Sequence, residues 1–410
     1  MTRDVPVAGE TDDAVLERLT AEFDHLDRAL TVDRSREVCR RLREQPGVSH
    51  TPAHGGYFVL TRYADVIEAQ RQAGRTCPVF SYSDGALHPR LDRPKAIPID
   101  FDGAEHAEYR KLFMDILNRR AVEGFETELR EEIDRVVTDF LARGTGDFSA
   151  EVARRLPIAV ISRLIGWSSA VSEQIGGLVE EMMAGFHSDG RPPARDQLLA
   201  LCQREVDDRR REPRDDYLTT LLRTTVFGRA LTDDELTNTL LTFIFGGYET
   251  TAAVIGNLMV RLAGDEGLQA LLRREPELIA PAIEESIRLQ PPVHVQFRTV
   301  TAEVEMDDTV LPEGSRVAVA WVSANNDPAQ FDAPDQFRLD RPNGRKHVGF
   351  GFGVHLCAGI HLARLELVCL FEELLGRGYR YEFAGTPVHS GLMIAHDAGW
   401  AELPIRCVAL

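Results

Sequence analysis

The spacing of hydrophobic and polar residues predicts helices over most of the first 260 positions. Helical patterns run from about 104 to 142, 151 to 186 and 195 to 223, with glycine-containing breaks between them. An early segment, Gly55–Leu60, favours a strand instead. The proline-dotted residues 77–101 have no clear period, and a loop of that length inside a compact protein is usually functional.

The longest predicted helix begins after Thr232. Thr232 and Glu235 have the spacing of a capping box, and the pattern continues without proline to about Ala263. About 30 residues at roughly 1.5 Å each span on the order of 45 Å, enough to cross the molecule. Gly246 and Gly247 lie in the middle, where each costs about 1 kcal/mol relative to alanine. Something other than helix stability therefore favours these two glycines.

The pattern changes after a short predicted helix near 276–289, which Pro291 and Pro292 end. Short strands are predicted at Gln296–Val300, Val304–Met306 and Arg316–Val319, followed by an irregular stretch and a last helix to about Leu375. The expected fold is therefore mainly α with a small β part (α+β). We expect a single domain over residues 1–410, with a flexible leader at about 1–12.

Composition narrows the function classes. The 47 Lys and Arg against 65 Asp and Glu give a net charge of −18, which argues against nucleic acid as a partner. No apolar run approaches the roughly 20 residues that a membrane span needs, and the polar first 13 residues do not resemble a secretory signal. The six cysteines form no CxxC pair. These features predict a cytoplasmic protein with reduced thiols and no membrane association.

One cysteine has unusual surroundings. Residues 350–359 read FGFGVHLCAG, and the glycines at 349, 351 and 353 permit a tight loop with an exposed backbone. Cys357 lies just before the last helix, whose N-terminal N–H groups favour thiolate over thiol, so it suits a metal ligand. The alternatives are a buried structural thiol or, less well supported without a βαβ unit, a nucleotide-binding loop.

This decapeptide resembles the haem-ligand signature of the cytochrome P-450 superfamily, at Phe350, Gly353, Cys357 and Gly359. The resemblance implies the P-450 fold, with haem b between the long central helix and the cysteine loop. It implies Cys357 as the axial thiolate on the haem iron, and Phe350, Gly351 and Gly359 as loop residues against the haem. It also implies that His355 binds a haem propionate.

Glu285 and Arg288 form a Glu-x-x-Arg pair on one helix face. Alone, such a pair is usually a surface ion pair worth under about 1 kcal/mol. In the family this pair precedes the cysteine loop and has an arginine as its third member, which Pro334–Arg341 supplies as Arg341. The resemblance implies a structural network of these three residues.

The long helix carries Gly-Gly-Tyr-Glu-Thr-Thr at 246–251, similar to the family's oxygen-binding signature. Small residues such as Gly246 let a flat cofactor lie against the helix. The resemblance implies that Thr250 holds O₂ and its water at the haem and that Glu249 relays protons. The alternative is a core threonine beside a solvated glutamate, because a mid-helix threonine usually bonds a carbonyl one turn back.

His106 and Arg110 are four residues apart and share a helix face. The surrounding stretch resembles the family's propionate-binding helix, although Gly103 and Ala104 replace its usual prolines. Arg298 matches a further propionate-binding arginine. The alternative for each of these residues is an ordinary surface charge.

The resemblance implies a monooxygenase that uses O₂ and electrons from a ferredoxin and a ferredoxin reductase, since the chain has no flavin or iron–sulfur motif. The docking face for these partners is expected at Arg345, Lys346, Arg364, Lys111, Arg119 and Arg120, the alternative being scattered solvated charges. The pocket is expected to be largely apolar and to bind a small organic substrate, with these residues: Phe80, Tyr82, Phe243, Gly247, Val293, His294, Val295, Gln296 and Leu392.

Hydroxylation, in biosynthesis slightly more than in catabolism, is the predicted reaction. Two rival hypotheses are a haem-thiolate enzyme of another type, such as a peroxide-driven oxidase or a dehydratase, and a non-catalytic haem-binding sensor.

Overall fold

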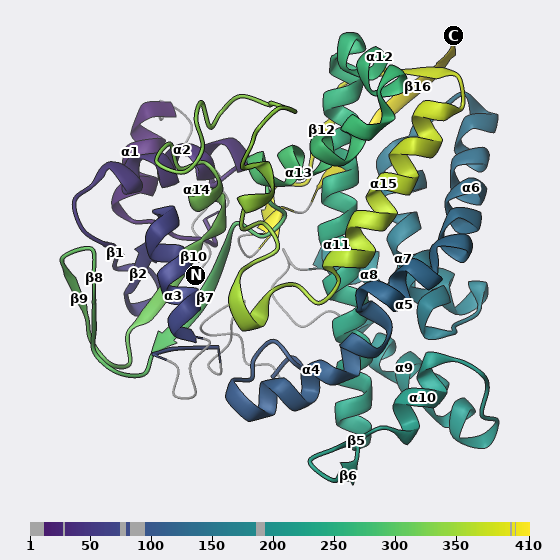
Figure 1. Cartoon of the computed structure of the whole chain (residues 1–410), viewed down its shortest axis with the longest axis horizontal. Helices are drawn as coiled ribbons and strands as arrows, with labels where there is room; N and C mark the ends of the chain where they lie inside the picture. The colour runs from purple at the N-terminus through teal and green to yellow at the C-terminus, as the bar shows by residue number, and fades with distance from the viewer. Residues whose placement is uncertain are drawn as a thin grey trace.

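The computed structural model describes residues 12–27, 29–73, 79–82, 95–185, 193–393, 396–397 and 399–410. Figure 1 shows a sheet-containing part on the left and a larger helical part on the right. This arrangement confirms the expected mainly α fold with a small β part. The predicted leader, apart from its last residue, and residues 83–94 of the predicted loop lie outside the described residues.

The largest sheet has five strands in the order β1-β2-β10-β7-β3. Their bounds are β1 (Ser49–Thr51), β2 (Tyr57–Leu60), β3 (Phe80–Ser81), β7 (Val295–Val300) and β10 (Arg316–Ala320). Strands β2 and β10 are parallel, whereas the other neighbours are antiparallel. Strands from the first 81 residues therefore share one sheet with strands from residues 295–320.

Side chains alternate between the two faces of this sheet, as the pleat requires. Val295 and Phe297 pack on one face with Tyr57, in a core that α1 (Asp12–Ala21) and α2 (Val32–Glu44) complete. The other face packs against α3 (Tyr63–Ala73) and the short α14 (Trp321–Asn325). Arg298, the neighbour of Phe297, points away from the core of α1 and α2.

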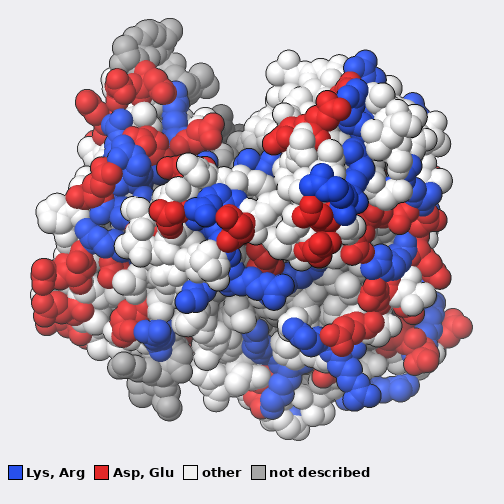
Figure 2. Space-filling model, turned by 45° about the horizontal axis from the view of Figure 1, so that its top comes forward, with Lys and Arg blue, Asp and Glu red and all other residues white. Residues whose placement is uncertain are grey.

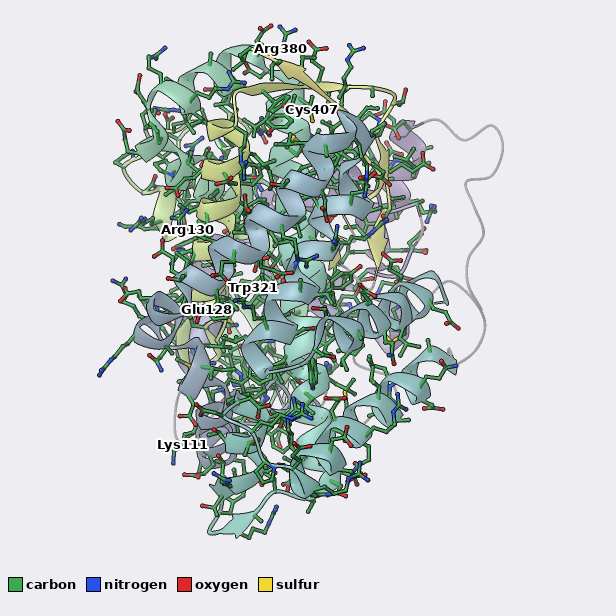
Figure 3. All side chains as sticks on the ribbon, turned by 90° about the vertical axis from the view of Figure 1, so that its right-hand side faces the viewer. Lys111, Glu128, Arg130, Trp321, Arg380 and Cys407 are labelled. Carbon is green, nitrogen blue, oxygen red and sulfur yellow. The ribbon has the colours of Figure 1, made fainter. Side chains whose placement is uncertain are left out.

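The helical part surrounds one large core. Its helices are α4 (Gly103–Leu117), α5 (Arg119–Gly124), α6 (Glu126–Arg143), α7 (Arg155–Ile165), α8 (Ser169–Gly185), α9 (Pro193–Arg211), α10 (Tyr217–Arg223), α11 (Asp233–Gly264), α12 (Glu266–Arg274), α13 (Ile279–Leu289) and α15 (Ile360–Gly376). At the surface, Arg130 of α6, which Figure 3 labels, reaches Glu372 of α15 at 3.0 Å.

Each of the three long helical segments predicted before residue 223 is in fact interrupted. Asn118 ends α4 and accepts a hydrogen bond from the Ala121 N–H, so its side chain caps α5. Gly166 ends α7 with a φ of +99°, which a residue with a Cβ rarely adopts. The prediction missed these local stop signals and also missed α12.

The long helix α11 is as predicted. The Thr232 hydroxyl accepts a hydrogen bond from the Glu235 N–H at 3.2 Å, and Glu235 Oε2 accepts one from the Thr232 N–H at 2.8 Å, which completes the capping box. With 32 residues, α11 runs through the helical part beside α15 (Figure 1).

The remaining elements are short. The further strands are β4 (Thr145–Asp147), β5 (Thr225–Val226), β6 (Arg229–Ala230), β8 (Val304–Met306), β9 (Thr309–Leu311), β11 (Tyr379–Phe383), β12 (Val388–His389), β13 (Leu392–Met393), β14 (His396–Asp397), β15 (Trp400–Glu402) and β16 (Pro404–Ala409). Short helical turns lie at η1 (Ala53–Gly55), η2 (Ser149–Ala153), η3 (Pro276–Leu278), η4 (Gly344–Lys346) and η5 (Gly353–His355). Within the described ranges, no helix combines the length and apolar character that crossing a membrane requires.

Candidate functional site

The cysteine loop closes on itself just before α15. The Cys357 N–H donates to the Phe350 carbonyl at 2.9 Å, and Gly351 and Gly353 have φ values of +74° and +77°. A Cβ on Gly353 would lie 3.1 Å from the carbonyl oxygen of Gln70 on α3. These glycines are therefore needed both for the turn and for the close approach of α3.

Cys357 lies two residues before Gly359, which is the N-cap of α15. Burial raises the pKa of the Cys357 thiol, although a hydrogen bond from Gly359 and the nearby guanidinium groups of Arg110 and Arg364 work in the opposite direction. The helix terminus is therefore not sufficient to lower the pKa of the free thiol, because desolvation is the larger effect. Metal coordination does remove the proton from a thiol.

Four basic residues predicted to bind propionates come together from three elements. His106 on α4 and His355 in η5 have ring centroids 3.9 Å apart. Arg110, one turn after His106, donates to the Leu356 carbonyl at 2.5 Å. Arg298 on β7 is fully buried. Burial of His106 lowers its pKa to about 3. Burial also lowers the pKa of His355, although Asp102 works in the opposite direction.

Three residues that the sequence analysis did not assign to this cluster complete it. Tyr82 stacks on His355 with centroids 3.5 Å apart, and the Arg298 guanidinium lies 3.3 Å from the centre of the Tyr82 ring. Gln70 Oε1 accepts hydrogen bonds from Arg298 and from the Tyr82 hydroxyl. Asp102 Oδ1 lies 3.6 Å from His355 Nε2, which is too long for a hydrogen bond. Tyr82 was predicted to line the substrate pocket, and its place here corrects that prediction.

Several buried polar atoms of this cluster have no hydrogen-bond partner among the described residues. They are Arg298 Nε, His106 Nε2, His355 Nε2, Gln70 Nε2 and Asp102 Oδ1. A fully buried arginine whose hydrogen bonds go only to neutral groups is costly unless an anion compensates it. Four unsatisfied nitrogens around Arg298 therefore form a site suited to carboxylate groups.

The middle of α11 provides the opposite wall. Gly246 is exposed although Ile244 and Tyr248 are buried, and a Cβ placed on Gly246 would contact nothing within 4 Å. The Thr250 hydroxyl donates to the Gly246 carbonyl at 3.0 Å. Glu249 Oε1 is buried without a hydrogen-bond partner among the described residues. Burial, assisted by the charge of Asp397, raises the pKa of Glu249 to about 8.

Two pocket predictions on α11 are wrong. A Cβ on Gly247 would clash with the side chain of Ile161 on α7, so this glycine serves helix packing. Phe243 is buried between two aromatic rings: its ring centroid lies 4.5 Å from that of Phe113 and 5.6 Å from that of Tyr217. Gly247 therefore faces α7, and Phe243 faces the rings that α4 and α10 supply.

The predictions on the sheet side fail for a related reason. Phe80 pairs with Val300 in the sheet and is fully buried. Val295 packs with the N-terminal helices, and His294 Nδ1 lies 3.0 Å from the Ser35 hydroxyl of α2. Burial lowers the pKa of His294 to about 4. Because side chains alternate along β7, Gln296 lies on the opposite face from Val295, the face that also carries Arg298.

The half-buried residues that remain candidates for the pocket are Val293, Gln296 and Leu392. Leu392 packs partly on the core around Val295. Residues 394 and 395, just after Leu392, lie outside the described residues.

Sequence and structure comparisons identify the relatives of this chain. A family model described as "Cytochrome P450" matches residues 193–385. Cytochrome P450 107B1 of Saccharopolyspora erythraea is 32% identical over 377 residues, covering 88% of this chain and 91% of the relative. The chain belongs to the cytochrome P450 family.

Two further P450 relatives are informative. Cyclomarin C epoxidase CymV of Salinispora arenicola is 29% identical over 380 residues, covering 88% of this chain and 93% of the relative. The crystal structure of HmtN, a post-tailoring hydroxylase involved in himastatin biosynthesis, is 27% identical with a TM-score of 0.78, over 90% of this chain and 95% of that one. This chain is thus an oxidoreductase of the P450 monooxygenase type, and haem b is its cofactor.

The described residues of this P450 fit haem. The unsatisfied donors around Arg298 match the two propionate groups, and the open side of Gly246 permits a flat ring beside α11. The free Cys357 thiol would supply a sulfur ligand for the iron. Three features from separate elements therefore match the carboxylates, the ring plane and the iron of one group.

A buried ionic network joins α13 to the segment that leads into the cysteine loop of this P450. Arg288 Nε donates to Glu285 Oε2 at 2.7 Å, and Arg341 Nε donates to Glu285 Oε1 at 2.7 Å. Arg288 also donates to the carbonyls of Asn325 and Pro334. This network binds α13 to the irregular segment that precedes the loop.

A second network was not predicted. Arg364 on α15 donates two hydrogen bonds of 2.7 Å to Glu284, and His347 Nε2 lies 3.1 Å from the same carboxylate. Burial alone would raise the pKa of Glu284, but His347 and Arg364 outweigh it and hold the pKa at about 2. Because Glu284 neutralises Arg364, the prediction of Arg364 as a docking cation is wrong.

Replacing Arg288 by alanine is expected to destabilise the protein by about 3–5 kcal/mol, because the Glu285 carboxylate would stay buried without its main partner. Urea unfolding followed by circular dichroism measures this change. Arg338→Ala is the matched control, since its side chain pairs only with exposed Asp332 and Asp340 and its backbone N–H still reaches Glu285. Equal effects of the two substitutions would contradict the structural role of the network.

Proposed function

We propose that this P450 hydroxylates a small, largely apolar organic molecule in bacterial secondary metabolism, with electrons from a separate ferredoxin and its reductase. The observation that carries the proposal is the buried, unpartnered Glu249 oxygen beside Thr250, at the point where α11 is open at Gly246. Burial raises the pKa of this carboxyl to about 8. A carboxyl group with a pKa of about 8 is a proton donor at neutral pH. Proton delivery is what reductive O₂ activation needs and what a sensor does not.

The haem, when bound, supplies the redox chemistry that activates O₂ and oxidises the substrate. The residues of the chain divide the remaining tasks. Cys357 would bind the iron, and the cluster around Arg298 would hold the propionates. Thr250 fixes a hydroxyl group at the open turn of α11, and Glu249 holds a proton one residue before it.

The substrate side is apolar with isolated polar groups. Gln296 on β7 and Val293, which precedes the strand, are half-buried, and Val293 forms a bridge with His396. Burial lowers the pKa of His396 to about 4, so its imidazole is neutral, and its Nε2 has no hydrogen-bond partner among the described residues. The side chains of Gln296 and His396 can orient a hydroxyl or amide group of an otherwise apolar substrate.

The names of the relatives support a role in tailoring. One is named an epoxidase of cyclomarin C, and the other a post-tailoring hydroxylase of himastatin biosynthesis. A related oxidation of a late biosynthetic intermediate is therefore proposed here, inside the bacterial cytoplasm.

Reconstitution tests this function. Purified holoprotein is titrated with a panel of natural-product intermediates, and compounds that shift the Soret band are incubated with ferredoxin, ferredoxin reductase, NAD(P)H and ¹⁸O₂. Mass spectrometry should show a product that has gained one labelled oxygen atom. Product formation from hydrogen peroxide alone, equal to that with the reductase, would favour the peroxide-driven alternative. Ligand binding without any consumption of reductant would favour the sensor.

The surface around the cysteine loop suits an acidic electron donor. Arg345 and Lys346 are exposed, and so are Arg119 and Arg120 on α5, which packs against α15. Among the described residues none of these four side chains has an acidic partner within 4.0 Å, whereas Lys111 is paired with Glu108. Phe352, Val354 and Leu356 are exposed on the same loop. Figure 2 shows basic and acidic residues interleaved over the visible surface, so the proposed attraction is local.

Charge reversal at Arg345 and Lys346 tests the docking face. The double variant Arg345→Glu/Lys346→Glu should raise the KM for ferredoxin about tenfold at low salt, and the effect should shrink as ionic strength rises. Stopped-flow reduction under carbon monoxide measures the electron transfer. Arg211→Glu/Arg274→Glu makes the same charge change on α9 and α12. A comparable loss in that control would contradict a local docking face.

A further inference from the structure

Three potential metal ligands meet in the N-terminal part of the molecule, in elements that do not contribute to the haem site. Asp24 and His25 lie between α1 and α2, and His54 lies in η1, before β2 (Figure 1). One ligand atom from each residue can be chosen so that all three lie within 4.8 Å of one another. Among the described residues this is the one such group of His, Cys, Asp and Glu side chains.

The hydrogen bonds around His25 determine its tautomer. The Tyr57 hydroxyl donates its single proton to the Phe23 carbonyl at 2.7 Å. It must therefore accept the hydrogen bond that joins it to His25 Nδ1 at 3.2 Å. With the proton on Nδ1, the lone pair of the His25 ring is on Nε2. A histidine that donates from one ring nitrogen to a fixed acceptor and ligates through the other is the usual arrangement at metal sites.

The backbone of η1 directs His54 toward Asp24. His54 has φ 53° and ψ 29°, and Gly55 and Gly56 also have positive φ values of 90° and 94°. His54 Nε2 lies 2.7 Å from Asp24 Oδ1. Asp24 Oδ1 is also fixed by the Leu26 N–H at 2.8 Å. The carboxylate and the second imidazole are therefore held next to His25, whose ring centroid is 5.2 Å from that of His54.

The group is accessible from solvent on one side. His54 lines an open pocket of about 480 Å³, together with His50, Tyr57 and Arg316. His25 itself is only 2% exposed, and Asp24 and His54 are half-buried. An ion would thus enter past His54, and the buried imidazole would bind on the inner side.

We propose that Asp24, His25 and His54 bind one Zn²⁺ ion through two imidazole nitrogens and one carboxylate oxygen, with water as the fourth ligand. This donor set suits a borderline cation such as zinc in tetrahedral geometry, with ligand distances of about 2.0–2.2 Å. Tetrahedral ligands at these distances lie roughly 3.3 Å apart, so the contact between Asp24 and His54 opens by a few tenths of an ångström on binding. The proton on His54 Nε2, which now faces Asp24, moves to Nδ1 of the same ring as Nε2 becomes a ligand, so the imidazole stays neutral.

Bound zinc would join the connection between α1 and α2 to the start of β2, two segments about 30 residues apart in the sequence. Because the site forms only in the folded chain, zinc binding should stabilise this part of the molecule. The alternative is that Asp24 and His54 form an ordinary hydrogen bond with no bound ion.

Isothermal titration of the haem-loaded full chain with ZnCl₂ tests the proposal, since the haem keeps Cys357 from competing. One Zn²⁺ per chain is expected at pH 7.5, and the same stoichiometry should be found when the titration is repeated in buffers of different ionisation enthalpy. Asp24→Asn and His54→Gln should each weaken binding at least about tenfold. His50→Gln, which changes a histidine of the same pocket outside the group, should bind zinc as the wild type does.

Tyr57→Phe tests the hydrogen bond between the Tyr57 hydroxyl and His25 Nδ1. It removes the acceptor that fixes His25, so zinc affinity should fall about tenfold while the zinc ligands are unchanged. The wild type should also gain thermal stability in zinc, and the His54→Gln protein should not. Crystals soaked in zinc should show an anomalous peak among the three side chains. Absence of saturable binding, an unchanged affinity in His54→Gln, or a peak only elsewhere would overturn the proposal.

Discussion

Replacing Cys357 by serine is expected to abolish the strongly red-shifted Soret band of the dithionite-reduced, carbon monoxide-bound protein. The band depends on a thiolate ligand of the iron that also binds carbon monoxide, and Cys357, in the loop just before α15, would be that ligand. Monooxygenase activity should fall below detection, because the electron donation that favours O–O cleavage is lost with the sulfur. The measurement is the reduced carbon monoxide difference spectrum of wild type and variant at equal haem content.

Cys407→Ser is the matched control for this experiment. Cys407 is a half-buried free thiol on β16, away from the loop, and its replacement should leave the band unchanged. Haem content measured after alkaline pyridine extraction separates loss of the ligand from loss of haem. A red-shifted band in haem-loaded Cys357→Ser would remove Cys357 from its proposed role and, with it, the monooxygenase mechanism.

The parts of the site that could be predicted from the sequence are those fixed by short-range spacing. The loop around Cys357 closes through contacts within eight residues, and Glu285 and Arg288 lie one turn apart on α13. His106 and Arg110 are placed on one face by helix geometry alone. In each case the positions of the residues in the sequence already determine which side chains can meet.

The pocket could not be predicted in the same way. Which face of β7 is open to a pocket depends on how β10 and β3 pair with it, and β3 lies more than 200 positions earlier in the sequence. Val295 therefore turned out to be core. Phe80 was misplaced because its partner in the sheet, Val300, was unknown.

The remaining differences between the sequence-based predictions and the structure arise from burial, which the sequence does not show. The sequence shows that Arg364 is basic, but not that Glu284 and His347 enclose its charge. It shows a helix start after Cys357, but not that the thiol is desolvated. The Asp24, His25 and His54 group was missed because its members come from two segments and have no spacing typical of a metal site.

Glu249→Gln is expected to lower the rate of coupled product formation by about 10²-fold, since a positioned proton donor contributes about that much or more. The carboxyl has a pKa of about 8 because burial disfavours its charge and Asp397 adds a negative neighbour. Wild-type turnover should therefore fall as pH rises through about 8, where the carboxyl loses its proton. The glutamine variant has no proton to lose there, so its low rate should be flat across this range.

The same shift has a consequence for stability. The folded-state pKa of Glu249 lies above its ordinary value of 4.5, so the folded chain binds more protons than the unfolded chain between these two pH values. Stability from this group is thus present at low pH and is lost as pH rises toward about 8. The Glu249→Gln protein should lose less stability between pH 6 and pH 9 than the wild type does.

Thr250→Ala distinguishes proton delivery from general damage to α11. The Thr250 hydroxyl bonds to the Gly246 carbonyl, so its removal leaves the helix hydrogen bonds in place but deprives the open turn of its hydroxyl group. Reductant consumption should continue while product per NAD(P)H falls about tenfold, with hydrogen peroxide accounting for the difference. Thr250→Ser, which keeps the hydroxyl, should restore most of the coupling. Unchanged product per NAD(P)H in Thr250→Ala would show that O₂ activation in this P450 does not depend on the Thr250 hydroxyl. The proton of Glu249 would then have to reach the site without Thr250.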